Sequence, residues 1–394
     1  MTSSSYFIRG ARQLLTLRGP QSARRGAALR ELAIIADGSV LIQNGRIMSV
    51  GPTRRIENMR EARQAVEIPV YDKVVMPGFV DAAVQLSPAG AAAGPAKRMM
   101  EFSNDVLLLM RSCLQHGTVT IRVHASADRP VTSADVSVLQ KLVRLGDEQM
   151  QVLRSWRVEA CVPEDAWPTL VKLRRRRMVD GISIASQPES EPDWERLEHL
   201  RSSGLAMYVL WGGGPAERLS KMLQRMQPVS ICALEPLSSR QADLLASTDV
   251  ITVLPAGKQI LEGNAFPSIR KLMDGGGAIA LSSGYHSGIA RNFNLQMALA
   301  LAVARMGLTP EEAISAATFN AACAANYAHT AGSIEVGKRA DVMVLNIPDF
   351  RDLPAQFGVN HVAMVFRAGE IVFNRMRRRD SADPSSDRMR TKSV

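Results

Sequence analysis

The chain has 394 residues, 46% of them hydrophobic, so it can bury a large core as one large domain or as one large and one small domain. This composition excludes disordered and fibrous proteins. The net charge of +10 lies at the chain ends: residues 1–30 carry six arginines and no acid, and residues 375–394 carry seven Lys or Arg against three Asp. The charges of residues 31–374 therefore sum to zero, and a basic groove for nucleic acid is not predicted.

The run Arg174–Arg177 is interpreted as a solvated helix face, with a site for phosphate or an acidic partner as the alternative.

The cysteines are far apart and form no Cys-x-x-Cys pair; they are Cys113, Cys161, Cys232 and Cys323. Neither a disulfide framework nor a structural zinc site is indicated, which favours a reducing compartment. The N-terminus has no apolar run long enough for a secretion signal, and eighteen uninterrupted apolar residues occur nowhere. We therefore expect a cytoplasmic protein without membrane insertion.

Both ends of the chain predict short β-strands. In "LAIIADGSVLIQNGRIMSVGP" the pairs Asp37-Gly38 and Asn44-Gly45 predict hairpin turns, and "HVAMVFRAGEIVFNR" predicts another near the C-terminus. Neither end can bury a sheet alone, so residues 31–74 and 332–374 are predicted to form one composite β-sandwich. Residues 1–30 are expected as a separate basic segment and residues 375–394 as a disordered tail.

Between these ends, residues 75–331 alternate strand-like runs with helical patterns. The strand candidates include "TVTIRVHA", "VDGISIAS", "AMYVLWGG", "VSICALEP", "VITVLPAG" and "AIALSSG". Residues 101–117 and 193–204 have helical periodicity and end at a glycine, and Thr309-Pro310 begins a further helix as N-cap and first residue. Such alternation over this length predicts a (β/α)8 TIM barrel, with a doubly wound sheet as the alternative.

Several phrases resemble imidazolonepropionase and related members of the amidohydrolase superfamily. They are "DGSVLIQNGRIMSVGP", "VMPGFVD", "HGTVTIRVHAS", "FPSIRKLMDGGGAIALSSGYHSG", "LTPEEAISAATFNAA" and "AGSIEVGKRADVMVL". The resemblance implies a TIM barrel with a metal at the carboxyl ends of its strands and a small sandwich made from both termini. It also implies hydrolysis of a non-peptide C–N bond by metal-bound hydroxide, with zinc or iron as the metal.

The ligand positions that the resemblance assigns do not carry ligands in this sequence. They fall on Ala83, Gln85, Leu210, Ala233 and Gly284. Alanine, leucine and glycine side chains offer no donor atom, and an amide oxygen is a poor ligand for zinc or iron. No cofactor is therefore predicted, and the family's substrate contacts cannot be transferred to this chain.

Two histidines follow strand-like runs on the side where barrel active sites form, His124 and His286. With Glu235 or Asp81 they could bind a metal in a new arrangement; the alternative is that both are ordinary rim histidines.

Three hypotheses about function follow. The first is a non-catalytic amidohydrolase homologue that acts as a binding or partner subunit, and the second is an active hydrolase with a rebuilt site around His124 and His286. The third is a nucleic-acid or membrane-surface protein that acts through its basic ends. A homodimer, or a heterodimer with a related chain, is expected, and a small-molecule ligand is left open.

Overall fold

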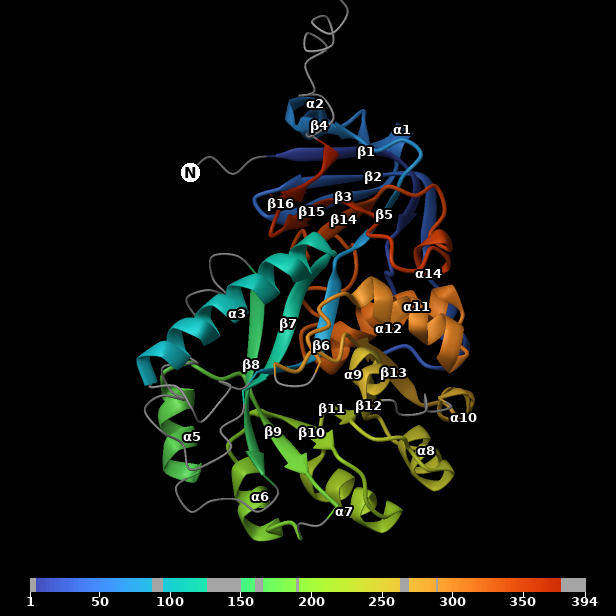
Figure 1. The fold of residues 1–394 in the computed structure, drawn as a ribbon. Coiled ribbons are helices and arrows are strands. Elements are labelled where there is room, and N and C mark those ends of the chain that lie inside the picture. The colour runs from blue at the N-terminus through green and yellow to red at the C-terminus, as the bar shows by residue number, and fades with distance from the viewer. Residues whose placement is uncertain are drawn as a thin grey trace, which may run out of the picture.

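The structure is a computed structural model that describes residues 5–86, 95–125, 150–159, 166–188, 191–262, 269–287 and 290–376. Two sheets organise the chain, and Figure 1 shows them at opposite ends of the molecule. Sheet A combines strands from the two ends of the sequence, and sheet B is formed by the central part. The predicted tail lies outside the described residues from residue 377 onward, as does Cys161; Cys113, Cys232 and Cys323 are free thiols.

Sheet A is the predicted small sandwich made from both termini. Its strand order is β16-β15-β14-β5-β1-β2-β3, with β4 also paired to β1. The joining point is β5, which pairs with β14 from the C-terminal part and with β1 from the N-terminal part. The strands are β1 (Tyr6–Leu15), β2 (Ile34–Gln43), β3 (Arg46–Pro52), β4 (Val66–Pro69), β5 (Val74–Pro77), β14 (Val342–Leu345), β15 (Val362–Arg367) and β16 (Glu370–Asn374).

Two turns in this sheet were predicted correctly and one was not. Asn44-Gly45 connects β2 to β3 with φ of 52° and 74°, and Ala368-Gly369 connects β15 to β16 with φ of 48° and 79°. Asp37 also has a positive φ, 45°, but it lies inside β2, which continues through Gly38 in register with β1. The hairpin predicted there is therefore wrong. The Asp37 side chain accepts a hydrogen bond from Thr53 Oγ1 at 2.9 Å.

The N-terminal segment is part of the fold, in contrast to the separate basic segment expected for residues 1–30. Residues 6–15 form β1 because apolar side chains recur along them, and Ile8, Leu14 and Leu15 are fully buried. Five of the six arginines of this segment have hydrogen-bond or ion-pair partners in the fold: Arg9 with Glu57 and Glu67, Arg12 with Asp72, Arg24 with the Leu17 carbonyl, Arg25 with Asp249, and Arg30 with Glu312. Most of the positively charged side chains near the N-terminus thus have partners within the fold.

Sheet B contains eight parallel strands in chain order and forms the predicted barrel. Its two edge strands approach each other beyond the end of β13, where Gln85 and His286 form a parallel bridge. The Gln85 N–H donates to the Tyr285 carbonyl at 2.9 Å, and the Ser287 N–H donates to the Gln85 carbonyl at 3.1 Å. The strands are β6 (Phe79–Leu86), β7 (Thr118–Ala125), β8 (Gln151–Glu159), β9 (Gly181–Ser186), β10 (Ala206–Trp211), β11 (Ser230–Ala233), β12 (Ile251–Pro255) and β13 (Ala278–Ser282).

Helices surround the barrel, as Figure 1 shows. The predicted start of α12 is confirmed: Thr309 and Glu312 form a capping box, and Pro310 is the first helical residue. In the described part of the chain, no helix combines the length and apolar character that a membrane span needs. The helices are η1 (Gly26–Arg30), α1 (Thr53–Ile56), α2 (Arg60–Gln64), α3 (Pro95–Gln115), α5 (Ala166–Arg175), α6 (Trp194–Arg201), α7 (Ala216–Met226), α8 (Ser239–Ala246), α9 (Ala256–Leu261), α10 (Arg270–Asp274), α11 (Leu295–Met306), α12 (Pro310–Ala317), α13 (Phe319–Ala324) and α14 (Asp352–Ala355).

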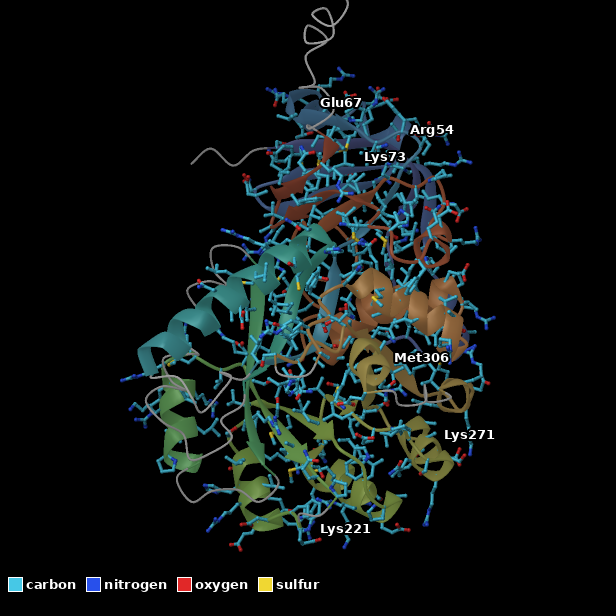
Figure 2. All side chains as sticks on the ribbon, viewed as in Figure 1. Arg54, Glu67, Lys73, Lys221, Lys271 and Met306 are labelled. Carbon is cyan, nitrogen blue, oxygen red and sulfur yellow. The ribbon has the colours of Figure 1, made fainter. Side chains whose placement is uncertain are left out.

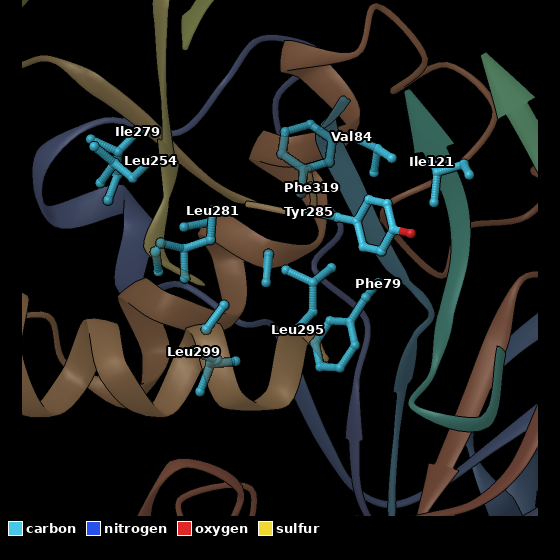
Figure 3. Packing of buried hydrophobic residues seen from close by; sticks show 14 of the residues in the cluster. Phe79, Val84, Ile121, Leu254, Ile279, Leu281, Tyr285, Leu295, Leu299 and Phe319 are labelled. Atoms are coloured by element: carbon cyan, nitrogen blue, oxygen red, sulfur yellow. The ribbon is translucent and has the colours of Figure 1, made fainter. Parts of the chain in front are cut away.

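Apolar side chains fill both faces of the barrel strands. One large cluster lies between the strands and the surrounding helices; Figure 3 shows part of it, with Phe79 of β6 beside Leu295 of α11. A second cluster takes members from six barrel strands and therefore occupies the barrel interior. Charged side chains extend outward around the surface, including Lys221 and Lys271 on the barrel helices (Figure 2). Arg174–Arg177 are exposed at the end of α5, as expected for a solvated face.

Candidate functional site

The carboxyl ends of the barrel strands carry the positions at which the family's metal ligands were expected. Ala83 and Gln85 lie on β6 and Leu210 lies on β10. Ala83 and Leu210 pack in the interior apolar cluster with Val80 and Val253. Gln85, which is 9% exposed, is the one position of the expected ligand set that carries a polar side chain.

The position on β11 faces the other way. Ala233 packs in the outer cluster between strands and helices, and its neighbour Cys232 belongs to the interior cluster. Burial raises the pKa of the Cys232 thiol to about 12, so it is protonated at neutral pH. Cys232 is therefore a neutral thiol among apolar side chains of the interior cluster.

Gly284 follows β13 in a conformation that excludes a side chain. Its φ is +72°, and a Cβ built on it would lie 2.6 Å from the Lys258 nitrogen and 2.9 Å from the Pro255 oxygen. Both neighbours are backbone atoms and cannot rotate away. The residues present at these positions therefore do not fit the metal that the family implies, because they supply apolar side chains, one carboxamide and a glycine that leaves no room for a carboxylate.

Asp81 fastens the first barrel strand to the last. Its side chain is 1% exposed and accepts hydrogen bonds from Ser282 Oγ at 2.6 Å, from the Ser283 N–H at 3.3 Å and from the Ala83 N–H at 3.4 Å. Burial raises the pKa of Asp81, while these donors act in the opposite direction. The carboxyl group thus has a positioning role at the junction of β6 and β13.

His124 lies in a buried polar cluster that spans three adjacent strands. Its Nδ1 is 2.5 Å from Ser183 Oγ on β9 and 2.9 Å from Ser155 Oγ on β8, and the two hydroxyls are 2.7 Å apart. The imidazole also has a hydrogen bond to the Ala82 backbone on β6. With Nε2 donating to that carbonyl, Nδ1 is the acceptor for a serine hydroxyl.

A buried cation, Arg122, precedes His124 by two residues on β7. Arg122 is 2% exposed, lies over the Tyr208 ring at 4.3 Å, and donates from Nη2 to the Ala325 carbonyl at 2.5 Å. Its Nε and Nη1 have no hydrogen-bond partner in the part of the chain that the structure describes. Burial, and secondarily the charge of Arg122, lower the pKa of His124 to about 3, so this imidazole is neutral at pH 7.

His286 and Glu235 do not join His124 in a metal site. His286 is half-buried, and its backbone pairs with Gln85 and Ala290. Gln85 is also the strand partner of His124, so the two histidines lie on either side of Gln85 on neighbouring strands. Among the described residues, however, no three His, Cys, Asp or Glu side chains lie close enough together to hold a metal ion.

Sequence reasoning missed several polar residues near this end of the barrel. The hydroxyl partners of His124 come from different strands, so no local motif contains them. Arg122 could have been found, because in "TIRVHA" it precedes His124 by two residues and strand alternation puts both on one face. Lys258 on α9 is 7% exposed, forms an ion pair with Glu262 and donates to the Leu234 carbonyl at 3.4 Å.

The sequence comparisons agree with this architecture. A profile described as "Amidohydrolase family" matches residues 226–372. An imidazolonepropionase of Geobacillus kaustophilus is 28% identical over 93% of this chain and 98% of its own length, and one of Parabacteroides distasonis is 29% identical over 94% and 99%. These matches support an amidohydrolase superfamily member. The chain resembles the imidazolonepropionases over nearly its whole length.

Solved structures of several enzymes show the same fold at lower identity. A triazine hydrolase variant superposes with a TM-score of 0.72 at 15% identity, covering 94% of this chain and 95% of its own. The guanine deaminase of E. coli superposes with a TM-score of 0.67 at 14% identity, covering 94% and 99%. For this amidohydrolase homologue, these likenesses establish the barrel and the sandwich, and the chemistry depends on its own residues.

Proposed function

We propose that this amidohydrolase homologue has lost metal-dependent hydrolysis and acts as a non-catalytic binding or partner subunit. The observation that carries the proposal is the composition of the expected metal site. Two of its five positions pack into the apolar interior, one faces the outer helices, and Gly284 has a backbone that excludes a side chain. A metal-bound hydroxide needs several deprotonated or imidazole ligands at one point, and these positions do not supply them.

The competing hypothesis is a rebuilt metal site around His124 and His286. It would require one ring nitrogen of His124 to give up its present partner, either the two serines or the Ala82 carbonyl, because a ligating nitrogen cannot keep its hydrogen bond. The present geometry favours a structural role for His124, which joins β6, β7, β8 and β9.

Metal analysis decides between these two hypotheses. Protein purified without added metal, and again after exposure to zinc, manganese and iron followed by desalting, is expected to hold less than about a tenth of an equivalent of any metal. Close to one equivalent, lost in both His124→Ala and His286→Ala, would overturn the proposal in favour of the rebuilt site. His199→Ala, an exposed histidine on α6, is the matched control.

The partner role has its own measurement. We expect sedimentation of the purified chain to show either a homodimer or a monomer that dimerises with a related amidohydrolase chain. A monomer that does not associate with any related chain, together with hydrolysis of a cyclic amide substrate, would contradict the proposal.

A further inference from the structure

A hollow of about 1230 Å³ opens at the end of the barrel opposite to the expected metal site. Its lining comes from the segments that precede β11 and β12, from α7 and α8, from residues 21–25, and from the chain that follows α13. These elements lie at the amino ends of the strands. The volume is of the order of a small-molecule site, although active sites of TIM barrels form at the other end.

The lining combines an apolar floor with carboxamide groups. Leu223, Val250 and other aliphatic side chains form the floor. Gln224, Gln227 and Asn326 come from two different segments, α7 with its C-cap and the residues after α13, and each carries both a donor and an acceptor. Such groups suit a ligand with a donor and an acceptor along one edge, as in an amide or a nucleobase.

The charged groups of the hollow are neutralised by each other. Arg25 Nη2 is 3.3 Å from Asp249 Oδ1, and Arg25 Nη1 donates to the carbonyls of Thr248 at 2.9 Å and Gly276 at 3.1 Å. Arg25 and Asp249 are the only Lys, Arg, Asp or Glu residues that line the hollow in the described part of the chain. A ligand that enters therefore meets no uncompensated formal charge from these side chains, which favours an uncharged compound.

Two of the carboxamide residues, Gln227 and Asn326, have a left-handed backbone conformation, which suggests that their side chains have a function. Gln227, the C-cap of α7, has φ 44°, and Asn326 has φ 54°. Glycine is the usual residue at a left-handed position after a helix, because a residue with a Cβ is less stable in that conformation. Glutamine at position 227 therefore has a conformational cost that glycine would avoid. Gln227 Oε1 accepts a hydrogen bond from Arg201 Nη2 at 2.5 Å, which orients the amide at the rim of the hollow.

We propose that this hollow binds an uncharged small molecule that carries an amide-like edge on a flat, partly apolar body, as a nucleobase or nucleoside does. The carboxamides of Gln224, Gln227 and Asn326 pair with the edge, and the aliphatic floor covers the ring. The proposal does not rest on the proposed function, because the hollow lies at the other end of the barrel from the expected metal site. It holds whether or not that site has any activity.

The test is calorimetric titration of the full chain with uridine and adenosine, and with their 5′-monophosphates as charged counterparts. We expect saturable binding of at least one nucleoside with a Kd below about 1 mM, and no tighter binding of its monophosphate. Gln224→Ala and Gln227→Gly are each expected to weaken that binding by about tenfold or more. Gln64→Ala, an exposed glutamine on α2 in the sandwich, should leave it unchanged.

Gln227→Gly separates the loss of binding from a loss of structure. Because glycine relieves the left-handed backbone, the variant should keep or slightly raise the melting temperature while it loses affinity. Absence of saturation with either nucleoside would overturn the proposal, and so would equal binding by the two hollow variants and the wild type. A monophosphate that binds more than about tenfold tighter than its nucleoside would refute the assignment to uncharged ligands.

Discussion

His124 should make the protein sensitive to mild acid. In the folded state burial lowers its pKa to about 3, whereas the unfolded chain has the ordinary value of 6.5. Below pH 6.5 the unfolded state therefore binds a proton that the folded state does not, so the stability contributed by the neutral imidazole is complete above pH 6.5 and falls as the pH decreases toward 3. From these two values, lowering the pH from 7.5 to 5 should reduce the free energy of unfolding by about 2 kcal/mol through this residue alone.

Urea denaturation of the wild type and of His124→Asn at several pH values between 7.5 and 5 measures this term. Asparagine keeps an acceptor toward Ser155 and Ser183 but does not titrate, so the variant should lose about 2 kcal/mol less than the wild type over that interval, whatever its stability at pH 7.5. His199→Gln, at an exposed position on α6, should behave like the wild type. Equal losses in the wild type and His124→Asn would refute the reasoning, since they would mean that the folded protein accepts the proton on His124 without cost.

Two further predictions concern the backbone at Gly284 and the ion pairs of a buried carboxylate, Glu312. Gly284→Ala should lower the free energy of unfolding by about 2 kcal/mol or more, because its Cβ would meet the Lys258 nitrogen at 2.6 Å in a left-handed conformation; thermal unfolding checks this, and an unchanged melting temperature would contradict it. Glu312→Gln should destabilise the fold by about 1–2 kcal/mol, because the Glu312 side chain is 2% exposed and pairs with Arg30 and Arg270, which are 56% and 34% exposed. Urea denaturation measures the second effect, and a change below about 0.5 kcal/mol would show that the pair is not formed in solution.

The sequence predicts most of the fold because the barrel strands are short apolar runs between regular helices. It does not identify β8, "QVLRSWRVE", since Arg154 and Arg157 interrupt the apolar pattern. The Arg154 guanidinium leaves the strand to pair with Asp180 at 3.4 Å, a contact invisible in local sequence. The N-terminal arginines led to the expectation of a separate basic segment for the same reason, because most of their partners lie far away in the chain.

The candidate site, too, can be predicted from the sequence only in part. The positions Ala83, Leu210 and Gly284 can be located from flanking phrases, and their inability to donate to a metal follows from residue type alone. The partners of His124 cannot be located, because Ser155 and Ser183 are brought to it by the lateral pairing of parallel strands. Sequence spacing carries no information about such contacts.

The difference from an ordinary amidohydrolase site extends beyond the identity of single ligands. Leu210 is packed among side chains from several strands, and the backbone at Gly284 occupies a conformation in which an aspartate would collide with the start of α9. Restoring a histidine at Leu210 would bury an imidazole among apolar neighbours, and restoring an aspartate at Gly284 would first require β13 and α9 to separate. The apolar filling is therefore a property of the packed barrel, and it follows that replacing ligands one at a time should lower stability before it creates a metal site.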